Sequence, residues 1–207
     1  RGHSRPDGAE LVERADAWFA ERGHDYVVTV RATGEDTSLE AAAEAAGLVK
    51  ALDRYPAMGT ERRLFAPPSP GLELRPVADE ADALAFWRVC AVAYPAIGFP
   101  EDAFDRFPPA TLLHEASAAF IGELEGEPVA TAMTSVLDGV GFVGWVGTTA
   151  AARGRGAGAA LTVAATNAAF DRGARLASLQ ASSMGESIYR RLGYRELFNY
   201  RLWARAW

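Results

Sequence analysis

A glycine-rich segment that leads into an alanine-rich run constrains this chain most. Residues 150–165 read AAARGRGAGAALTVAA, and three glycines and two arginines fall within six of these positions. Alanine favours helix, so a helix is expected to begin at Ala157. A helix start has unpaired backbone N–H groups and a partial positive charge, and glycines let a ligand approach the backbone closely. The segment therefore predicts either a simple tight turn or a cradle for an anion such as phosphate.

Two common phosphate-binding loops do not fit this segment. A nucleotide P-loop ends in Gly-Lys-Ser/Thr, which is absent here. A dinucleotide fingerprint fits nominally at Gly154, Gly156 and Ala159, but it requires an acidic residue at the end of the next strand. That strand ends at residues 180–182, which read Gln-Ala-Ser. The remaining type is the pyrophosphate loop of proteins that use acyl-coenzyme A.

The composition fits a globular protein that binds neither nucleic acid nor membranes. Apolar residues make up 49% and charged residues 23% of the chain, and the net charge is −6. With no 18-residue apolar run and no signal peptide, a cytoplasmic location is expected. The single cysteine, Cys90, lies in an apolar run and is expected to be a buried thiol, not a nucleophile. His3, His24 and His114 lack metal-ligand spacing, so no metal is expected.

Residues 1–66 predict a small α/β segment. The expected elements, in order, are a helix at Ala9–Arg22, a strand at Tyr26–Arg31 and a helix at Ser38–Ala46. A further strand is expected after them. Three prolines and a glycine in residues 66–71 predict a linker. The same helix–strand–helix order recurs near the C-terminus, where Gly193 corresponds to Gly47. We interpret residues 1–66 as a degenerate partial copy of the last third of the chain. The alternative is a chance similarity between helix–glycine–strand units.

Residues 67–207 predict a larger α/β domain. The turns Glu125-Gly126-Glu127 and Asp138-Gly139 predict an antiparallel meander of three strands, and the proline-rich residues 95–110 predict a loop or short helices. The expected elements are a strand at 72–77, a helix at 80–94, strands at 117–126, 127–139 and 141–149, a helix at 157–172, a strand at 175–181, a helix at 185–192 and a final strand or pair at 194–204.

Two motifs in this domain resemble a known family. RGRGAG at 153–158 resembles the coenzyme A motif of GNAT-type N-acetyltransferases, and SMGESIYRRLGY at 183–194 resembles the Tyr-x-x-x-Gly-Phe/Tyr end of that family's last helix. The resemblance covers about residues 71–207. It implies an α/β (α+β) fold: a mixed, mostly antiparallel sheet, splayed between its fourth and fifth strands, with helices on both faces. The expected division is a partial N-terminal segment at 1–66 and an acetyltransferase domain at 67–207.

The resemblance also implies a function. An acetyl group is expected to pass from acetyl-CoA, the cosubstrate, to a primary amine of a small-molecule acceptor, without a metal. Transfer from another acyl-CoA, or a non-catalytic coenzyme A-binding module, are the alternatives. Whether the chain forms a homodimer is left open. The cofactor-binding residues implied by the resemblance are Val146, Gly147, Thr148, Arg153, Gly154, Arg155, Gly156, Ala157, Gly158, Ala159 and Ser182.

Tyr189 is the residue that the resemblance implies to be catalytic. In the family, a tyrosine at this position lies near the thioester sulfur and can protonate the leaving thiolate. The alternative is a core tyrosine on an amphipathic helix. Many members have Asn where this chain has Ser182, which is still a hydrogen-bond donor. Residues 1–66 have Ala43 in the place of Tyr189 and no glycine loop, so they are expected to bind no coenzyme A.

The general base is not identified by the sequence. Many family members use a carboxylate on the fourth strand, but residues 141–149 contain none. Water that relays a proton to a backbone carbonyl is an equal alternative to the acidic candidates, which are Glu101, Asp102, Glu115 and Glu123. The phenylalanines of the proline-rich segment form either a wall of the acceptor pocket or ordinary core; they are Phe99, Phe104 and Phe107.

Overall fold

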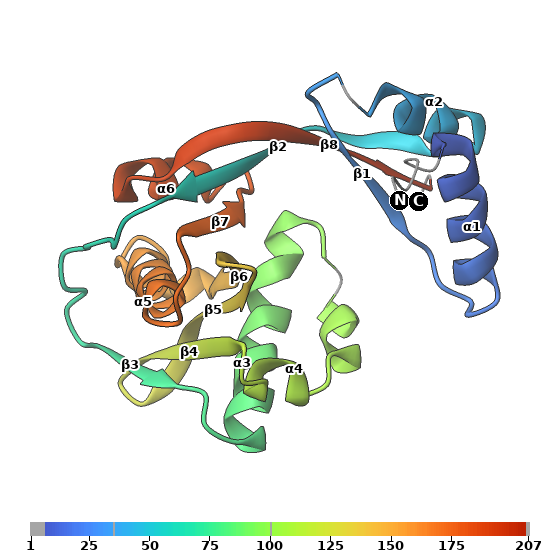
Figure 1. Ribbon diagram of the computed structural model, residues 1–207. Helices are drawn as coiled ribbons and strands as arrows, with labels where there is room; N and C mark the ends of the chain where they lie inside the picture. Colours follow the sequence, from blue (N-terminus) through green and yellow to red (C-terminus); the bar gives the residue numbers. More distant parts are fainter. Residues whose placement is uncertain (1–6, 35, 100, 206–207) are drawn as a thin grey trace. The chain divides into compact units, whose positions relative to one another are not determined.

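The computed structural model describes residues 7–34, 36–99 and 101–205; His3 lies outside this range. Its helices are α1 (Gly8–Ala20), α2 (Thr37–Ala45), α3 (Glu80–Ala93), η1 (Tyr94–Ile97), η2 (Glu101–Arg106), α4 (Ala110–Leu113), η3 (Ala150–Ala152), α5 (Ala157–Asp171) and α6 (Glu186–Leu192). Its strands are β1 (Val27–Arg31), β2 (Val49–Thr60), β3 (Leu72–Pro76), β4 (Ser117–Leu124), β5 (Glu127–Leu137), β6 (Val140–Thr148), β7 (Leu176–Gln180) and β8 (Arg195–Ala204). Figure 1 shows this order by colour.

The strands confirm the predicted fold class, a mixed and mostly antiparallel sheet. Neighbouring strands are hydrogen-bonded in the order β1-β8-β2-β7-β6-β5-β4-β3. The predicted meander is present as β4, β5 and β6, which pair antiparallel. At both turns the two central residues have positive φ: 55° and 81° at Glu125 and Gly126, and 51° and 78° at Asp138 and Gly139. This is the turn geometry that matches the twist of paired strands.

The chain divides into two compact units, with one boundary inside strand β2. One unit comprises residues 7–57 together with 196–205, and the other comprises Met58–Arg195. Strand β2 continues through Ala57 to Thr60, so the proline-rich residues 66–71 connect two strands inside the second unit. A composition change along the chain marks a loop, whereas a compact unit depends on contacts between distant residues. The sequence-domain division at 66 and 67 stays a prediction.

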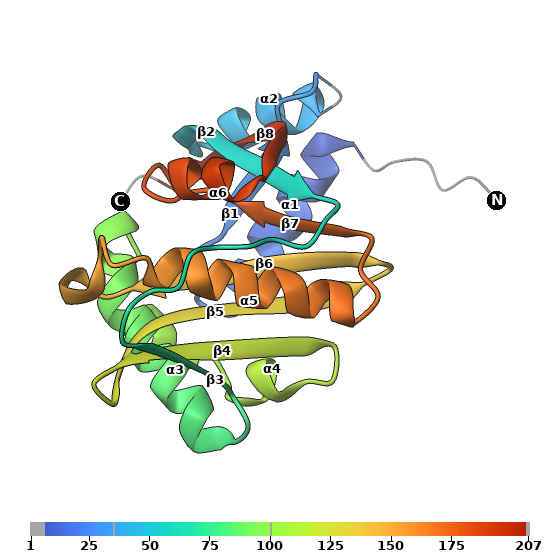
Figure 2. The same ribbon diagram turned by 90° about the vertical axis from the view of Figure 1, so that its left-hand side faces the viewer.

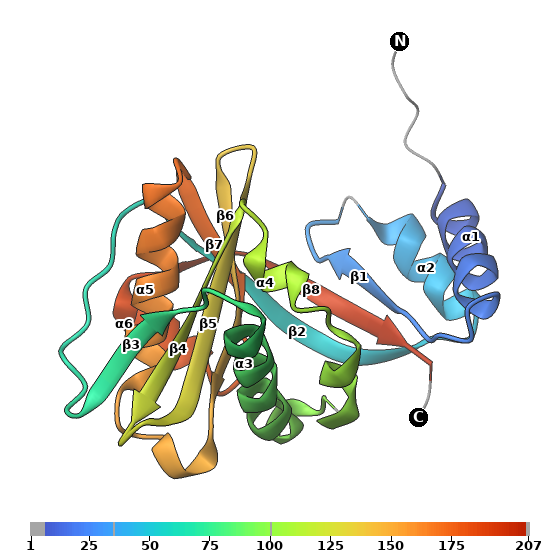
Figure 3. The same ribbon diagram turned by 90° about the horizontal axis from the view of Figure 1, so that it is seen from below.

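Helices cover both faces of the sheet in the second unit. Figures 1 and 3 show α3 and α4 on one face and α5 on the other. Small residues bring α5 close to the strands: a Cβ built at Gly141 would lie 2.5 Å from the Cβ of Ala169, and one at Gly122 would lie 2.7 Å from Leu161. The alanine-rich composition of α5 therefore serves close helix–sheet packing as well as helix formation.

The sheet splays between the fourth and fifth strands of this unit, β6 and β7. The two strands run parallel and pair at Val140, Gly141 and Phe142 of β6. The described ladder ends there, although β6 continues to Thr148. Figure 2 shows the two strands separating toward their C-terminal ends. The predicted splay is confirmed, and it leaves the far end of β6 with an open edge.

The first unit has its own apolar core. Val12 of α1, Val28 and Val30 of β1 and Ala43 of α2 are buried together with Trp203 of β8. Its elements follow the order helix, strand, helix, strand, as the proposed copy requires. That order agrees with a degenerate copy, but a shared origin stays a prediction. None of the described helices is long and apolar enough to cross a lipid bilayer.

Cys90 is buried on α3, as expected from its apolar surroundings. Burial raises the pKa of its thiol to about 12, partly opposed by a 3.5 Å contact with Thr131 Oγ1. At pH 8 such a thiol is ionised to about one part in ten thousand, and the thiolate is the reactive form. Iodoacetamide should therefore leave the native protein unlabelled at pH 8 and label it fully in guanidinium chloride. Rapid labelling of the folded protein, read by mass spectrometry, would contradict a buried thiol.

Candidate functional site

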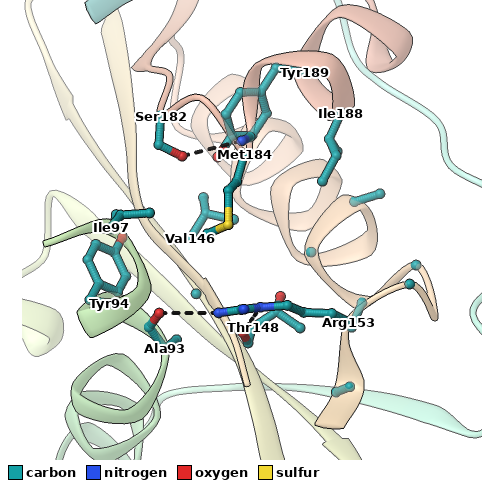
Figure 4. Close-up of a pocket in the computed structure, with 18 of the residues that line it drawn as sticks. Ala93, Tyr94, Ile97, Val146, Thr148, Arg153, Ser182, Met184, Ile188 and Tyr189 are labelled. Carbon is teal, nitrogen blue, oxygen red and sulfur yellow. Dashed lines mark hydrogen bonds between the residues drawn. The ribbon is translucent and has the colours of Figure 1, made fainter. Parts of the chain in front are cut away.

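A cavity of about 400 Å³ lies in the second unit, beside the open end of β6. Figure 4 shows its labelled lining, with Arg153 and Thr148 on one side and Ser182, Met184 and Tyr189 on the other. The lining residues are Ala93, Tyr94, Ile97, Val146, Gly147, Thr148, Ala152, Arg153, Gly154, Gly156, Ala157, Gly158, Ala159, Ser182, Met184, Gly185, Ile188, Tyr189 and Arg191. The residues predicted to bind the cofactor all line this cavity except Arg155, and Tyr189 lines it too.

The glycine turn forms one end of the cavity. Gly154 and Gly156 have φ of 75° and 84°, which a residue with a side chain rarely adopts. Gly156 is the N-cap of α5, and the first hydrogen bond across this end runs from Ala160 N to Gly156 O over 3.0 Å. The N–H groups of residues 157–159 therefore precede the helical ladder, as at every helix start. Residues 157–159 also line the cavity, so the partial positive charge at the N-terminus of α5 lies at the cavity wall.

The open edge of β6 forms a second side of the cavity. Thr131 and Met133 of β5 pair with Gly147 and Gly144, so Trp145 and Val146 together lie opposite the single residue Ala132. This bulge gives Trp145 a φ of 49°, and Thr131 Oγ1 donates a 2.9 Å hydrogen bond to its carbonyl oxygen. Beyond the bulge, residues 146–148 line the cavity. An extended ligand can pair with such an edge as an added strand.

The two arginines of the glycine segment behave differently. The Arg153 guanidinium group donates from Nη2 to Ala93 O over 3.4 Å and from Nε to Thr148 O over 3.3 Å, as Figure 4 shows. Arg155 is exposed and lies outside the lining, and its carbonyl oxygen accepts a 2.5 Å hydrogen bond from Ser69 Oγ. The side chain of Arg153 therefore faces the cavity, whereas Arg155 contributes to the turn through its backbone.

Tyr189 forms the third side of the cavity from α6. Only 7% of its surface is exposed, and its ring packs edge-to-face on Tyr194 with the ring centroids 6.1 Å apart. Tyr189 thus lies in the core and also lines the cavity, and its catalytic role stays a prediction. Ser182 lines the cavity nearby and accepts a 3.3 Å hydrogen bond from Gly185 N.

Gly185 is a site residue that the sequence reasoning missed. Its backbone has helical geometry, with φ of −86°, but a Cβ there would lie 2.7 Å from Cε2 and 3.1 Å from the hydroxyl oxygen of Tyr189. Gly185→Ala should therefore displace the Tyr189 ring without straining the backbone. If Tyr189 is catalytic, as the resemblance implies, turnover should fall about tenfold or more and the affinity for acetyl-CoA should stay nearly unchanged.

A double-mutant cycle tests this positioning role of Gly185. If alanine acts by moving the hydroxyl of Tyr189, then Gly185→Ala should have little further effect on turnover in a Tyr189→Phe background. Turnover and the affinity for acetyl-CoA are measured on all four proteins of the cycle. Losses that multiply fully would mean that Gly185 does not act through Tyr189.

Three of the four acidic candidates for a general base, Asp102, Glu115 and Glu123, lie away from the lining. Glu123 is paired with Arg75, with 2.7 Å between Oε1 and Nε, and Asp102 and Glu115 are exposed. The side chain of Glu101 lies outside what the structure describes. The charged groups that do line the cavity are Arg153 and Arg191. Their guanidinium groups, together with the N-terminus of α5, make the described lining favourable for an anionic ligand.

The cavity thus combines three chemical functions. The α5 end offers N–H donors for phosphate, β6 offers a free edge for an extended polar chain, and Tyr189 lines the side opposite Arg153 and Thr148. These groups suit a ligand that has a diphosphate at one end and an amide-containing arm. Coenzyme A is such a ligand. The fold and the cavity therefore fit the class of proteins that bind coenzyme A.

Comparison with known families agrees with this class. The acetyltransferase (GNAT) family matches residues 83–194, more than half of the 207-residue chain. The chain belongs to the GNAT acetyltransferase family. Its members use acyl-CoA, and the chain is accordingly an acyltransferase by family. No curated protein has a sequence similar enough to match.

Solved structures show the same fold. A GCN5-related N-acetyltransferase from Kribbella flavida has a TM-score of 0.72 and 28% identity, over 97% of this chain and 77% of that chain. A GCN5-related N-acetyltransferase from Sphaerobacter thermophilus has a TM-score of 0.69 and 23% identity, over 96% of this chain and 67% of that chain. A predicted acetyltransferase with acetyl-CoA from Clostridium acetobutylicum has a TM-score of 0.53 and 19% identity, over 60% of this chain and 90% of that one.

Proposed function

We propose that this protein transfers an acetyl group from acetyl-CoA to a primary amine of a small molecule. The observation that carries the proposal is the single cavity that joins the N-terminus of α5, the open edge of β6 and Tyr189. Family membership supports the use of an acyl-CoA donor. The structural neighbour from Clostridium acetobutylicum is described as bound to acetyl-CoA, which supports acetyl as the group transferred.

The donor is proposed to bind along the cavity in a fixed direction. Its diphosphate accepts hydrogen bonds from the N–H groups of residues 157–159, near Arg153. The amide-containing arm pairs with residues 146–148 of β6. A fit of this kind requires a bare backbone at Gly158, where a Cβ would already lie 3.1 Å from Thr148 Oγ1. This direction places the thioester at the end of the cavity that holds Tyr189 and Ser182.

The reaction forms one bond and breaks one. The neutral amine nitrogen attacks the thioester carbonyl carbon, a C–N bond forms, and the C–S bond breaks. The nitrogen loses one proton to water, and the sulfur gains one from the hydroxyl of Tyr189, which is then reprotonated by solvent. Tyr189 is thus the general acid of the proposal.

An amine screen tests the proposal. The protein is incubated with acetyl-CoA and a panel of primary amines, and free thiol is followed with Ellman's reagent. The single, buried Cys90 should not interfere with this readout. Thiol release that depends on both the amine and the protein, with the acetylated amine identified by mass spectrometry, is expected. Replacing acetyl-CoA by propionyl- or succinyl-CoA in the same assay tests the donor. Absence of amine-dependent release across the panel would contradict the transferase activity.

A non-catalytic coenzyme A-binding module is the second candidate. It is favoured by the position of the described base candidates Asp102, Glu115 and Glu123, which stand outside the cavity lining. Such a module would bind acetyl-CoA in calorimetry and release no thiol with any amine. A cytoplasmic location, expected from the sequence, stays a prediction.

A further inference from the structure

Aromatic side chains gather beside the cavity, on the face of the sheet that α3 covers. This aromatic cluster consists of Trp87, Tyr94, Phe99, Phe104, Phe107 and Trp145. Trp145 lies at its centre: its ring centroid is between 5.0 and 6.4 Å from that of every other member. The rings meet mostly edge-to-face or tilted, which is the favourable geometry for aromatic pairs.

The bulge in β6 places Trp145 on the face of the sheet where this cluster lies. Regular alternation would place Trp145 on the same side of the sheet as Val143, which packs in the core beneath α5. The extra residue reverses the alternation, so Trp145 packs with the α3 side while Val146 returns to the α5 side. The φ of 49° at Trp145 is strained for a bulky residue. Strain of this kind is concentrated at functional sites.

Part of the cluster is buried and part is open. Trp87 and Phe104 are only 4% and 3% exposed, whereas Phe99 is 43% exposed. Tyr94, Phe107 and Trp145 are half-buried. The buried rings therefore support the others, and Phe99 has the most exposed ring of the cluster.

The aromatic cluster is continuous with the cavity proposed to hold the donor. Tyr94 lines the cavity, and its ring centroid lies 5.8 Å from that of Phe99. A Cβ built at Gly147 would lie 3.4 Å from the Tyr94 ring, so the cluster borders the open edge of β6 directly. An acceptor that rests on these rings would have its nitrogen at that edge. The charged residues of the cavity lining are the cations Arg153 and Arg191, which disfavour an acceptor with several positive charges.

We propose that the aromatic cluster is the acceptor-binding wall, and that the acceptor is a monoamine carried on an aromatic or similarly flat apolar body. The proposal rests on the transferase function proposed above and names its substrate class. The rings bury the apolar body, and their faces attract the amine end through its positive charge before it loses a proton. Phe99 is the specificity-determining residue, because it is the most exposed member of the cluster.

A matched pair of amines tests the substrate class. Phenethylamine and butylamine each present one primary amine on an unbranched alkyl carbon, but only phenethylamine carries a ring. Burying one ring should give phenethylamine about a 10- to 100-fold higher kcat/KM than butylamine. Spermidine and glucosamine complete the panel as a polycationic and a polar acceptor, and both are expected to be poorer than phenethylamine.

Variants of Phe99 test the residue. Phe99→Ala should raise the KM for phenethylamine about tenfold, leaving the affinity for acetyl-CoA unchanged, and Phe99→Tyr should restore the wild-type KM. Phe65→Ala is the control, because Phe65 is 82% exposed and lies outside the aromatic cluster. It should leave all these values at wild-type levels. A thermal melt verifies that each variant is folded.

The outcomes separate this proposal from the function on which it rests. Turnover that favours spermidine or glucosamine would overturn the substrate class and leave the transferase function standing. An equal loss for butylamine and phenethylamine in Phe99→Ala would likewise overturn the role of Phe99. Absence of turnover with every amine, in a protein that binds acetyl-CoA, would overturn both proposals.

Discussion

Gly158→Val is expected to weaken acetyl-CoA binding about 100-fold. The glycine lies in the first turn of α5 and lines the cavity, and a Cβ there would already be 3.1 Å from the Oγ1 of Thr148, another lining residue, so the two methyl groups of valine would crowd the space between α5 and β6. They would keep a diphosphate from the N–H groups of residues 157–159. Hydrogen bonds to a charged group contribute about 1.5–3 kcal/mol each, and 1.4 kcal/mol corresponds to a tenfold change in Kd.

Gly158 is a cleaner test site than Gly156. Gly156 has a φ of 84°, so valine there would strain the backbone at the start of the helix as well as fill space. At Gly158 the backbone conformation is one that a residue with a side chain adopts readily, because no positive φ occurs there. Ala164→Val is the matched control, since Ala164 is a half-buried residue of α5 outside the cavity lining.

Isothermal calorimetry with acetyl-CoA gives the affinity, and circular dichroism verifies the fold. Ala164→Val should bind acetyl-CoA as the wild type does, with a similar small cost in helix stability from the β-branched side chain. If folded Gly158→Val bound acetyl-CoA with wild-type affinity, the N-terminus of α5 would not be the diphosphate site.

The parts of this site that the sequence predicts are those with local causes. The glycine turn is visible because left-handed backbone at Gly154 and Gly156 strongly favours glycine. The hairpin turns at residues 125–126 and 138–139 are visible for the same reason. Helix α5 begins at Ala157 as expected, since alanine-rich runs favour helix and the glycine before it ends the preceding segment.

The parts that sequence reasoning missed depend on packing between distant segments. Tyr94 and Ile97 are the ends of η1, where α3 passes into the proline-rich segment, and only the folded chain brings them to β6. The bulge at Trp145 reverses a strand alternation that the residue pattern alone predicts to be regular. Gly185 has a weak signal, because a glycine four residues before an aromatic residue on a helix lies beneath its ring.

The two-unit division was hidden for a related reason. Residues 196–205 belong to the unit formed by residues 7–57, although they follow the acetyltransferase motifs directly in sequence. Strand β8 pairs antiparallel with β1, with Val27 opposite Ala204 and Arg31 opposite Tyr200. No feature of either strand alone specifies a partner so distant along the chain. The family match ends at residue 194, just before the residues 196–205 that belong to the first unit.

Tyr189→Phe is expected to lower turnover about 100-fold while the affinity for acetyl-CoA stays nearly unchanged. The substitution removes the hydroxyl and keeps the ring that packs on Tyr194 and over Gly185. General-acid assistance contributes roughly 10²–10⁴-fold to a rate, and a coenzyme A thiolate is a moderate leaving group that needs only partial help. The loss should therefore fall at the lower end of that range. Because the hydroxyl serves the transition state more than the bound donor, Kd should change little.

Tyr194→Phe is the matched control for this prediction. Tyr194 is 2% exposed, and its hydroxyl forms a 2.7 Å hydrogen bond with Thr166 Oγ1, away from the cavity lining. Its loss leaves a buried threonine hydroxyl with one partner fewer and should cost about 1–2 kcal/mol of unfolding free energy. Turnover should remain near the wild-type value. The two variants should thus have opposite effects: Tyr189→Phe loses activity, and Tyr194→Phe loses stability.

Measuring kcat, the Kd for acetyl-CoA and the denaturation midpoint on both variants separates a catalytic tyrosine from a structural one. A purely structural Tyr189 would behave as Tyr194 does, with a lower midpoint and nearly normal turnover. A catalytic Tyr189 requires the opposite pattern, and its effect should vanish when the leaving group needs no proton. The acetyl thioester of a coenzyme A analogue with a more acidic thiol should therefore narrow the difference between Tyr189→Phe and the wild type. Full turnover of Tyr189→Phe with acetyl-CoA would remove Tyr189 from the mechanism.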